Sequence, residues 1–244
     1  MEELNSDSSI QRVIGIVSGK GGVGKSTVTA LLARKLAKAG YRVGIMDADI
    51  TGPSIPKMFG ITGRIEGMEP KVSAEGIKVV SMNLFLDSEE RAVIYRGPLI
   101  SSIIKQFWTD IHWGELDFLL IDMPPGTGDV PLTVYQSIPV DGIVIVTSPQ
   151  QLVKMIIMKA YDMAHKMDIP VLGLVENYSY FSCPDCGGRH NIFGDSHIDE
   201  IASAIGTKVL AKLPIIPELA RAEDEGVAAD AEVEFDMDSV IGKD

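Results

Sequence analysis

Glycine and lysine are concentrated in one short segment near the start of the chain. Residues 19–27 read GKGGVGKST and fit the pattern G-x-x-x-x-G-K-[ST], after an apolar run and before a helical pattern. In such a loop the glycines let backbone N–H groups converge on phosphate oxygens, and the following helix adds its partial positive charge. The pattern places Lys25 against the β- and γ-phosphates of a nucleoside triphosphate and the Ser26 hydroxyl on magnesium. The predicted phosphate-binding residues are Gly21, Gly22, Val23, Gly24, Lys25, Ser26 and Thr27.

Acidic residues follow two of the apolar runs. Asp47 and Asp49 come after the run Val43–Met46, and Asp122 comes directly after Phe118–Ile121. Carboxylates at the carboxyl ends of parallel strands face the ligand crevice of an α/β sheet. One member of the first pair can support magnesium while the other orients the attacking water, and Asp122 stands where a second metal-supporting acid is expected.

A pair of cysteines marks a second candidate site. Cys183 and Cys186 enclose two residues and are followed by two glycines, so both thiolates can face one metal ion. Tetrahedral zinc and iron-sulfur clusters normally take four protein ligands, and this pair supplies two. His190 and His197 can complete a zinc site within the chain, or a second copy can supply two more thiolates for one [4Fe-4S] cluster. The third alternative is a pair of free thiols. We expect the segment 183–197 to be a metal-binding loop insertion.

The residues around these sites predict the scaffold that positions them. Short β-branched runs alternate with segments of helical spacing, which is typical of repeated βαβ units around a parallel sheet buried on both faces. The predicted strands are Val13–Val17, Val43–Met46, Ile77–Ser81, Phe118–Ile121, Ile143–Thr147, Val171–Val175 and Val209–Leu213. Between the first two, apolar residues from Val28 to Leu36 fall at helical spacing, and the pattern ends at Gly40. The fold class is therefore α/β, a doubly wound, mostly parallel sheet with helices on both faces.

Composition limits the domain count and the partners. With 244 residues and 45% hydrophobic content, we expect a single domain spanning 1–244, with mobile ends at 1–11 and 227–244 and an irregular loop at 51–76. The net charge of -12 argues against broad attraction to nucleic acid or to anionic lipid. The polar, acidic first residues contain no signal-peptide core, and no apolar run approaches the ~20 residues of a membrane span. The expected location is the cytoplasm, with no nucleic acid or membrane partner.

Three strings resemble a known class. SGKGGVGKS at 18–26 looks like the deviant Walker A of the SIMIBI class of P-loop NTPases, which includes MinD, ParA, the nitrogenase iron protein and the Mrp/ApbC ATPases. DADITGPS at 47–54 and DMPPGTGD at 122–129 resemble the Mrp/ApbC branch, and the resemblance extends from about Val13 to Gly226. It implies an ATP-sandwich homodimer in which Lys20 reaches the partner's nucleotide.

The resemblance also implies roles for individual residues. Lys20, Lys25 and Asp49 would be catalytic, with Asp49 orienting water, and Asp47 would support magnesium. Asn177 carries an amide that can donate and accept, which suits an adenine edge, and the class has an asparagine there; turn capping is its alternative role. Pro214 belongs to a string that resembles the loop closing over the base.

For the cysteine pair, the resemblance implies a [4Fe-4S] cluster that bridges two subunits. The implied function is an ATPase with slow, regulatory hydrolysis that carries the cluster to apo iron-sulfur proteins. Residues 195–197 read DSH where the family usually shows further glycine, which leaves His197 open as a local ligand. The alternatives are a ParA/MinD-like positioning ATPase and a zinc-binding or metallochaperone NTPase.

Overall fold

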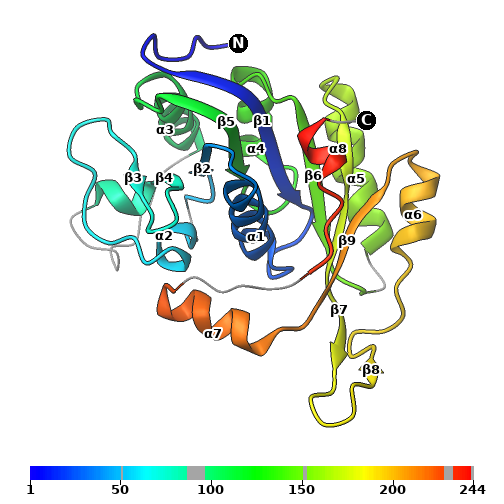
Figure 1. Cartoon of the computed structure of the whole chain (residues 1–244). Helices are drawn as coiled ribbons and strands as arrows, with labels where there is room; N and C mark the ends of the chain where they lie inside the picture. The colour runs from blue at the N-terminus through cyan, green and yellow to red at the C-terminus, as the bar shows by residue number, and fades with distance from the viewer. Residues whose placement is uncertain (51, 87–96, 151–152, 228–232, 243–244) are drawn as a thin grey trace.

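The computed structural model of the chain describes residues 1–50, 52–86, 97–150, 153–227 and 233–242, and is built around one twisted sheet (Figure 1). The strands run in the order β3-β4-β2-β5-β1-β6-β7-β8, and β9 pairs with β7. The described strands are β1 (Ser9–Ser18), β2 (Val43–Asp47), β3 (Lys71–Val72), β4 (Lys78–Ser81), β5 (Glu115–Asp122), β6 (Gly142–Thr147), β7 (Val171–Ser182), β8 (Arg189–His190) and β9 (Val209–Pro214). The pairs β3–β4 and β7–β8 are antiparallel, and the other described pairs are parallel.

Helices cover both faces of the sheet. In Figure 1, α1 lies in front of the central strands, and α3, α4 and α5 lie behind them. The described helices are α1 (Lys25–Lys38), α2 (Ile55–Met58), the 3-10 helix η1 (Met82–Phe85), α3 (Gly97–Thr109), α4 (Asp129–Ser137), α5 (Val153–Lys166), α6 (Ile198–Ala204), α7 (Pro217–Glu225) and α8 (Asp238–Ile241). This arrangement confirms the doubly wound, mostly parallel α/β fold.

The predicted strands and the first helix are present, and two strands are longer than expected. β1 begins at Ser9 rather than Val13, because Ser9 pairs with Glu115 at the start of β5. β7 continues to Ser182, well past the expected end at Val175. The extension of β7 is polar, so its apolar pattern ends before the strand does. It carries the strand from the centre of the sheet to the cysteine pair.

Central strands are apolar on both faces, as a sheet covered by two helical layers requires. Ile14 and Ile16 of β1, Leu120 of β5 and Val144 of β6 are fully buried. This rigid centre fixes the strand ends that carry the site. Among the described residues, no helix combines the length and the apolar character needed to cross a membrane.

The N-terminal end of the chain is packed rather than loose. The Glu2 backbone N–H donates to the Ser137 carbonyl at 2.7 Å, and the Trp108 indole N–H donates to the Glu2 carbonyl at 3.1 Å. These contacts differ from the mobile end expected for residues 1–11. Both use backbone groups of Glu2, which amino-acid composition does not reveal.

The C-terminal end also differs from the mobile segment expected for 227–244, within its described part 233–242. The Asp236 N–H donates to the Leu210 carbonyl of β9 at 2.8 Å, and Val240 of α8 is fully buried. The prediction rested on the acidic composition of this segment, which shows neither the burial of one valine nor a backbone hydrogen bond. The end therefore adds to the core beside β9.

Two glycines bring α2 and α7 into close contact. The described part of the segment expected to be irregular, 52–76, contains α2 and β3. Gly60, just after α2, has φ of +60°, and a Cβ there would lie 2.4 Å from the carbonyl oxygen of Gly226, the residue that caps α7. A side chain fits at neither position without displacing backbone, so these glycines set the position of α7.

Replacing Gly60 by alanine is expected to lower the free energy of unfolding by about 3 kcal/mol, because the methyl group must displace a backbone carbonyl as well as occupy a left-handed conformation. Gly67→Ala is the matched control: its φ is +76°, but no atom of the described residues lies within 4 Å of the added Cβ. That control is expected to lose about 1 kcal/mol. Urea unfolding measures both, and equal losses would contradict the proposed close contact.

Candidate nucleotide and metal-cluster sites

The phosphate loop joins β1 to α1 and opens onto a cavity. Gly22 and Gly24 have φ of +80° and +77°, a conformation that favours glycine, and α1 begins at Lys25. The backbone N–H groups at the start of α1 therefore face the loop, as anion binding requires. The cavity measures about 270 Å³ and is lined by Ser18, Gly21, Gly22, Gly24, Lys25, Ser26, Thr27, Asp49, Ser54, Met58, Pro125 and Tyr178. Most of the predicted phosphate-binding residues are thus gathered around one cavity.

Asp122, at the end of β5, is the centre of the polar contacts beneath this loop. The Lys25 ammonium lies 2.8 Å from one carboxylate oxygen, in an ion pair whose partners are 6% and 0% exposed. The Ser26 hydroxyl donates to Asp122 at 2.6 Å and the Thr29 hydroxyl at 2.7 Å. The lysine and the hydroxyl that the sequence assigns to phosphate and magnesium therefore converge on the acid assigned to the metal.

Asp47 lies beside Asp122, because the two residues are paired in register between β2 and β5. It is fully buried and accepts hydrogen bonds from the Ser81 hydroxyl at 3.1 Å and the Asp49 N–H at 3.2 Å. Burial, and then the charge of Asp122, raise the pKa of Asp47 to about 8. Two adjacent buried carboxyl groups and a serine hydroxyl form a set of hard oxygen donors, which suits magnesium. The residues present therefore fit the metal that the phosphate loop implies.

Asp49 and Lys20 take different positions relative to the cavity. Asp49 is one of the residues that line it, and its water-orienting role stays a prediction. Lys20 is exposed, is not among the cavity's lining residues, and donates from Nζ to the Gln150 side-chain oxygen at 3.1 Å. The two lysines of the loop are therefore distinct: one is buried against Asp122, and the other lies on the surface.

Asn177 is buried under the phosphate loop. Its Nδ2 donates to the Val23 carbonyl at 3.0 Å, and its Oδ1 accepts from the Tyr178 N–H at 3.0 Å. A Cβ on Gly24 would stand 2.1 Å from Nδ2, so glycine is required where the asparagine crosses. The side chain thus caps its own turn and clamps the loop, and its contact with adenine stays a prediction.

Pro214 lies away from the phosphate cavity. It ends β9, is paired in register with Tyr180, and lines a separate cavity of about 800 Å³ together with Arg189 and Lys212. The sequence placed it over the base because of its neighbours in the chain. The separation of the two cavities depends on how far β7 and β9 extend. The few residues around Pro214 carry no information about that length.

Two residues near the loop were missed by the sequence analysis. Tyr178 lines the cavity with φ of +58°, an uncommon conformation for a residue with a side chain. Glu223 of α7 accepts a hydrogen bond from the Thr27 hydroxyl at 2.9 Å. No sequence motif indicates either residue. The backbone conformation of the tyrosine and the contact of the glutamate with α1 are set by the tertiary structure.

The cysteine pair sits on a hairpin at the end of β7. Ser182 ends the strand, Cys183 is half-buried and Cys186 is exposed, and both cysteines are free. The Cys183 N–H donates to the Gly188 carbonyl at 2.9 Å, which closes the turn. The backbone N–H of Cys186, followed by that of Asp185, holds the pKa of the Cys183 thiol below its ordinary value. A lowered thiol pKa favours the thiolate, which is the metal-binding form.

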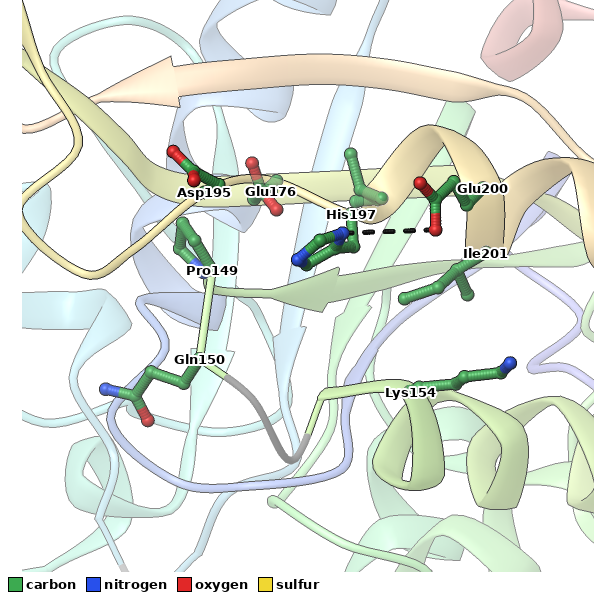
Figure 2. Close-up of a pocket in the computed structure, with 9 residues that line it drawn as sticks. Pro149, Gln150, Lys154, Glu176, Asp195, His197, Glu200 and Ile201 are labelled. Carbon is green, nitrogen blue, oxygen red and sulfur yellow. Dashed lines mark ion pairs between the residues drawn. The ribbon is translucent and has the colours of Figure 1, made fainter.

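Of the two histidines considered for a zinc site, His190 lies near Cys186, since a Cβ on Gly188 would be 3.3 Å from the Cys186 Sγ and 3.6 Å from the His190 Nε2. No cluster of three or more His, Cys, Asp or Glu side chains that could hold a metal ion occurs in the described part of the chain. His197 instead lies beside Glu176 and Asp195, as Figure 2 shows. These residues line a cavity of about 230 Å³, and the Nδ1 of His197 lies 3.9 Å from Glu200. The described geometry therefore offers two thiols at the hairpin and no complete zinc site.

Comparison with known proteins decides the family. The chain matches the family described as ParA: NUBPL iron-transfer P-loop NTPase over residues 9–241. The chain belongs to this family.

Relatives of this NUBPL-family chain are similar over most of their length. It is 46% identical to the iron-sulfur cluster carrier protein of Clostridium perfringens, over 96% of this chain and 86% of that one. It is 45% identical to the iron-sulfur cluster carrier protein of Methanocaldococcus jannaschii, over 90% and 78%. The resemblance to the Mrp/ApbC branch inferred from the motifs is thus confirmed as membership of an iron-sulfur cluster carrier family.

Solved structures support the same fold. The nucleotide-binding protein from Archaeoglobus fulgidus in complex with ADP superposes with a TM-score of 0.79 at 45% identity, covering 89% of this chain and 87% of that one. The septum site-determining protein MinD from Pyrococcus horikoshii, complexed with Mg-ADP, gives 0.64 at 22% identity over 90% and 87%. The second likeness shows the fold alone. The family is a P-loop NTPase family, and this chain has the complete phosphate loop.

Because Asn177 holds the phosphate loop, removing its amide is expected to weaken the binding of phosphates. Asn177→Ala is expected to weaken binding of tripolyphosphate, which has no base, as well as of ATP, by about tenfold each, since one buried hydrogen bond to the loop is lost. Isothermal titration calorimetry measures both, with the exposed Asn191→Ala as control. Loss of ATP binding with tripolyphosphate binding unchanged would show that the side chain serves the base rather than the loop.

Proposed function

We propose that this chain is an ATP-binding, slowly hydrolysing homodimeric carrier that holds a [4Fe-4S] cluster between two copies and transfers it to apo iron-sulfur proteins. The observation that carries the proposal is the free pair Cys183 and Cys186 on the hairpin that directly follows β7, a strand that also contacts the phosphate loop. Each hairpin offers two thiols, whereas a [4Fe-4S] cluster takes four. A two-fold axis supplies the other two from an identical hairpin. The names of the relatives support the cargo.

The nucleotide half of the proposal assigns roles to residues around the phosphate cavity. Ser26, Asp47 and Asp122 would hold magnesium, which when bound neutralises charge between the phosphates. Lys25 would exchange its ion pair with Asp122 for the β- and γ-phosphates. Asp49, which lines the cavity, would orient the attacking water. The ADP complex of the Archaeoglobus relative supports a nucleotide at this loop.

Lys20 would complete the site of the second copy. Its side chain is exposed and donates a hydrogen bond to the neutral side chain of Gln150. A hydrogen bond between an exposed ammonium and an amide is weak, so the lysine can leave it with little loss of free energy. Dimerisation would then turn Lys20 toward the partner's triphosphate, where its charge is worth far more in a water-excluded site.

Strand β7 would couple the two halves. Asn177 clamps the phosphate loop, and Ser182, five residues further along the strand, is followed directly by Cys183. The ring of Tyr178 lies 6.2 Å from that of Phe193, in the segment that returns from the hairpin. A change of the loop on binding or hydrolysis would therefore reach the cysteine hairpin through one continuous strand, altering how the dimer holds its cluster.

We place the protein in the cytoplasm as one P-loop ATPase domain, with apo iron-sulfur proteins as partners. The net charge of -12 disfavours nucleic acid and anionic membranes as partners. This charge also disfavours the ParA/MinD-like positioning role.

Lys20→Ala tests the shared nucleotide site. The variant is expected to bind ATP within about threefold of wild type but to lose ATP-dependent dimerisation and at least about tenfold in hydrolysis rate, because a charge that acts across the interface is removed. Analytical ultracentrifugation with a non-hydrolysable ATP analogue and a phosphate-release assay give the two readouts. The control is Lys154→Ala, an exposed lysine near the start of α5. A dimeric, fully active Lys20→Ala variant would contradict the assignment.

Anaerobic reconstitution tests the cluster. Wild type with iron and sulfide is expected to show visible absorption and, once reduced, an EPR signal, with about four irons and four sulfides per dimer. Cys183→Ala and Cys186→Ala should each lose the cluster while keeping ATP binding. Stoichiometric zinc without cluster absorption would instead favour the zinc-binding alternative. The carrier step is measured by transfer of the cluster to an apo-ferredoxin.

A further inference from the structure

The cavity of about 230 Å³ drawn in Figure 2 is distinct from the phosphate cavity and has no part in the proposed nucleotide chemistry. It lies between the start of α5, strand β7, helix α6 and the segment that leads into α6. Its lining combines apolar walls with carboxyl groups. The apolar residues are Pro149, Ile198 and Ile201, and the acidic residues are Glu176, Asp195 and Glu200.

Glu176 supplies the most deeply buried carboxyl group of this lining. Its side chain is on β7 and is 1% exposed. Its Oε2 accepts a hydrogen bond from the Ser179 hydroxyl at 2.6 Å, and the described residues give Oε1 no hydrogen-bond partner and the carboxylate no ion pair. Lys212, in register with Glu176 on β9, forms its ion pair with Asp199 instead. A buried carboxylate without a cation is unfavourable, so a positive group entering the cavity would be bound there.

The other cationic side chains of the lining do not supply that positive group. Lys154 extends away from Glu176 in Figure 2. His197 is 69% exposed, and its Nδ1 lies 3.9 Å from Glu200 rather than beside Glu176. Three carboxyl groups therefore face one lysine in this lining, and the cavity keeps an excess of negative charge.

The chemistry of the lining selects the kind of ligand. Negative charge repels anions, and the described part of the chain holds no group of three or more His, Cys, Asp or Glu side chains that could bind a metal ion. An organic cation is left. Because the walls are apolar and the buried end is acidic, the ligand that matches both is an aliphatic stem with a cationic end, which is the side chain of arginine or lysine.

Exposed apolar residues beside the cavity indicate that the basic side chain arrives on a protein surface. Ile192 and Phe193 are 58% and 42% exposed, and they lie in the segment that returns from the cysteine hairpin. A Cβ on Gly194 would be 3.6 Å from the Pro149 carbonyl oxygen, so this segment packs against the cavity wall. Neighbouring large apolar side chains beside a charged site are typical of a protein-protein interface.

We propose that a recipient protein docks on this surface, inserting an arginine or lysine side chain toward Glu176 and packing apolar groups against Ile192 and Phe193. The inference rests on the proposed function, because its partner is an apo iron-sulfur protein. The net charge of -12 favours a partner with a basic patch. The docked protein would lie beside the hairpin that carries Cys183 and Cys186, where a cluster has to be handed over.

Small probes test the cavity by itself. The full-length chain is titrated with N-acetyl-arginine amide, N-acetyl-lysine amide and the uncharged N-acetyl-norleucine amide, and binding is followed by saturation-transfer NMR. At least one basic probe is expected to bind about tenfold tighter than the norleucine probe, the effect of one hydrogen-bonded ion pair. Glu176→Gln is expected to lose this preference. Glu225→Gln, an exposed carboxylate on α7, is the matched control and should keep it.

A pair of recipients tests the docking surface. Two apo-ferredoxins that differ only in an arginine or a glutamine beside their cysteines are titrated with the cluster-loaded chain. Wild type is expected to bind the arginine form about tenfold tighter, and Glu176→Gln to bind both forms alike. Asp195→Asn, at an exposed position of the lining, is the second variant should Glu176→Gln fold poorly, and is expected to lose part of the preference.

Phe193→Ser tests the apolar part of the surface. It is expected to weaken binding of both ferredoxins by about fivefold without changing the preference between them, because it removes apolar contact and no charge. Val72→Ser is the matched control, since Val72 is 59% exposed on β3 and is not part of this surface.

The outcomes separate this inference from the proposed function. Wild type without preference for the basic probes, or a Glu176→Gln variant that keeps it, would overturn the docking site and leave the carrier proposal standing. A chain that assembles no cluster would overturn the carrier proposal, while the amide probes would still decide whether the cavity takes a basic side chain. Loss of ATP-dependent dimerisation in Phe193→Ser would assign the surface to the second copy, and the recipient site would be wrong.

Discussion

Asp122 is the group on which the site depends. A carboxylate that is fully buried at the end of a central strand is unfavourable unless it is paired and hydrogen-bonded. Lys25, Ser26 and Thr29, all from the first turns of α1, supply the ammonium and two hydroxyls within 2.8 Å. The same contacts therefore fasten the start of α1 to β5 and gather the groups that would bind phosphate and magnesium.

Asp47, next to Asp122, has an unfavourable interaction with it. Its burial beside Asp122 raises its pKa to about 8, so the pair is under electrostatic stress that a divalent cation would relieve. Register between β2 and β5 enforces this proximity, since both acids end their strands at the same level. The strand register thus holds two buried carboxyl groups together at the place where the proposed magnesium would bind.

Strand β7 shows how one element can serve two sites. Its first half is apolar and belongs to the sheet, as the sequence indicated. Its second half passes under the phosphate loop at Asn177 and ends beside Cys183. The apolar pattern ended at Val175 because the extension is held by backbone pairing with β8 and β9 and by polar side chains, and neither contributes to hydrophobic periodicity.

The sequence by itself determined the fold class, the phosphate loop, the acids at the ends of β2 and β5, and the cysteine pair. Each is a local signal: glycine spacing, an apolar run followed by an acid, or two thiols two residues apart. Only the tertiary structure decided that Asn177 clamps the loop, that Pro214 faces another cavity, that both ends pack, and that Glu223 reaches Thr27 across 196 positions. The reason is that such contacts join residues far apart in the chain, and their geometry depends on strand register and on where α7 comes to rest.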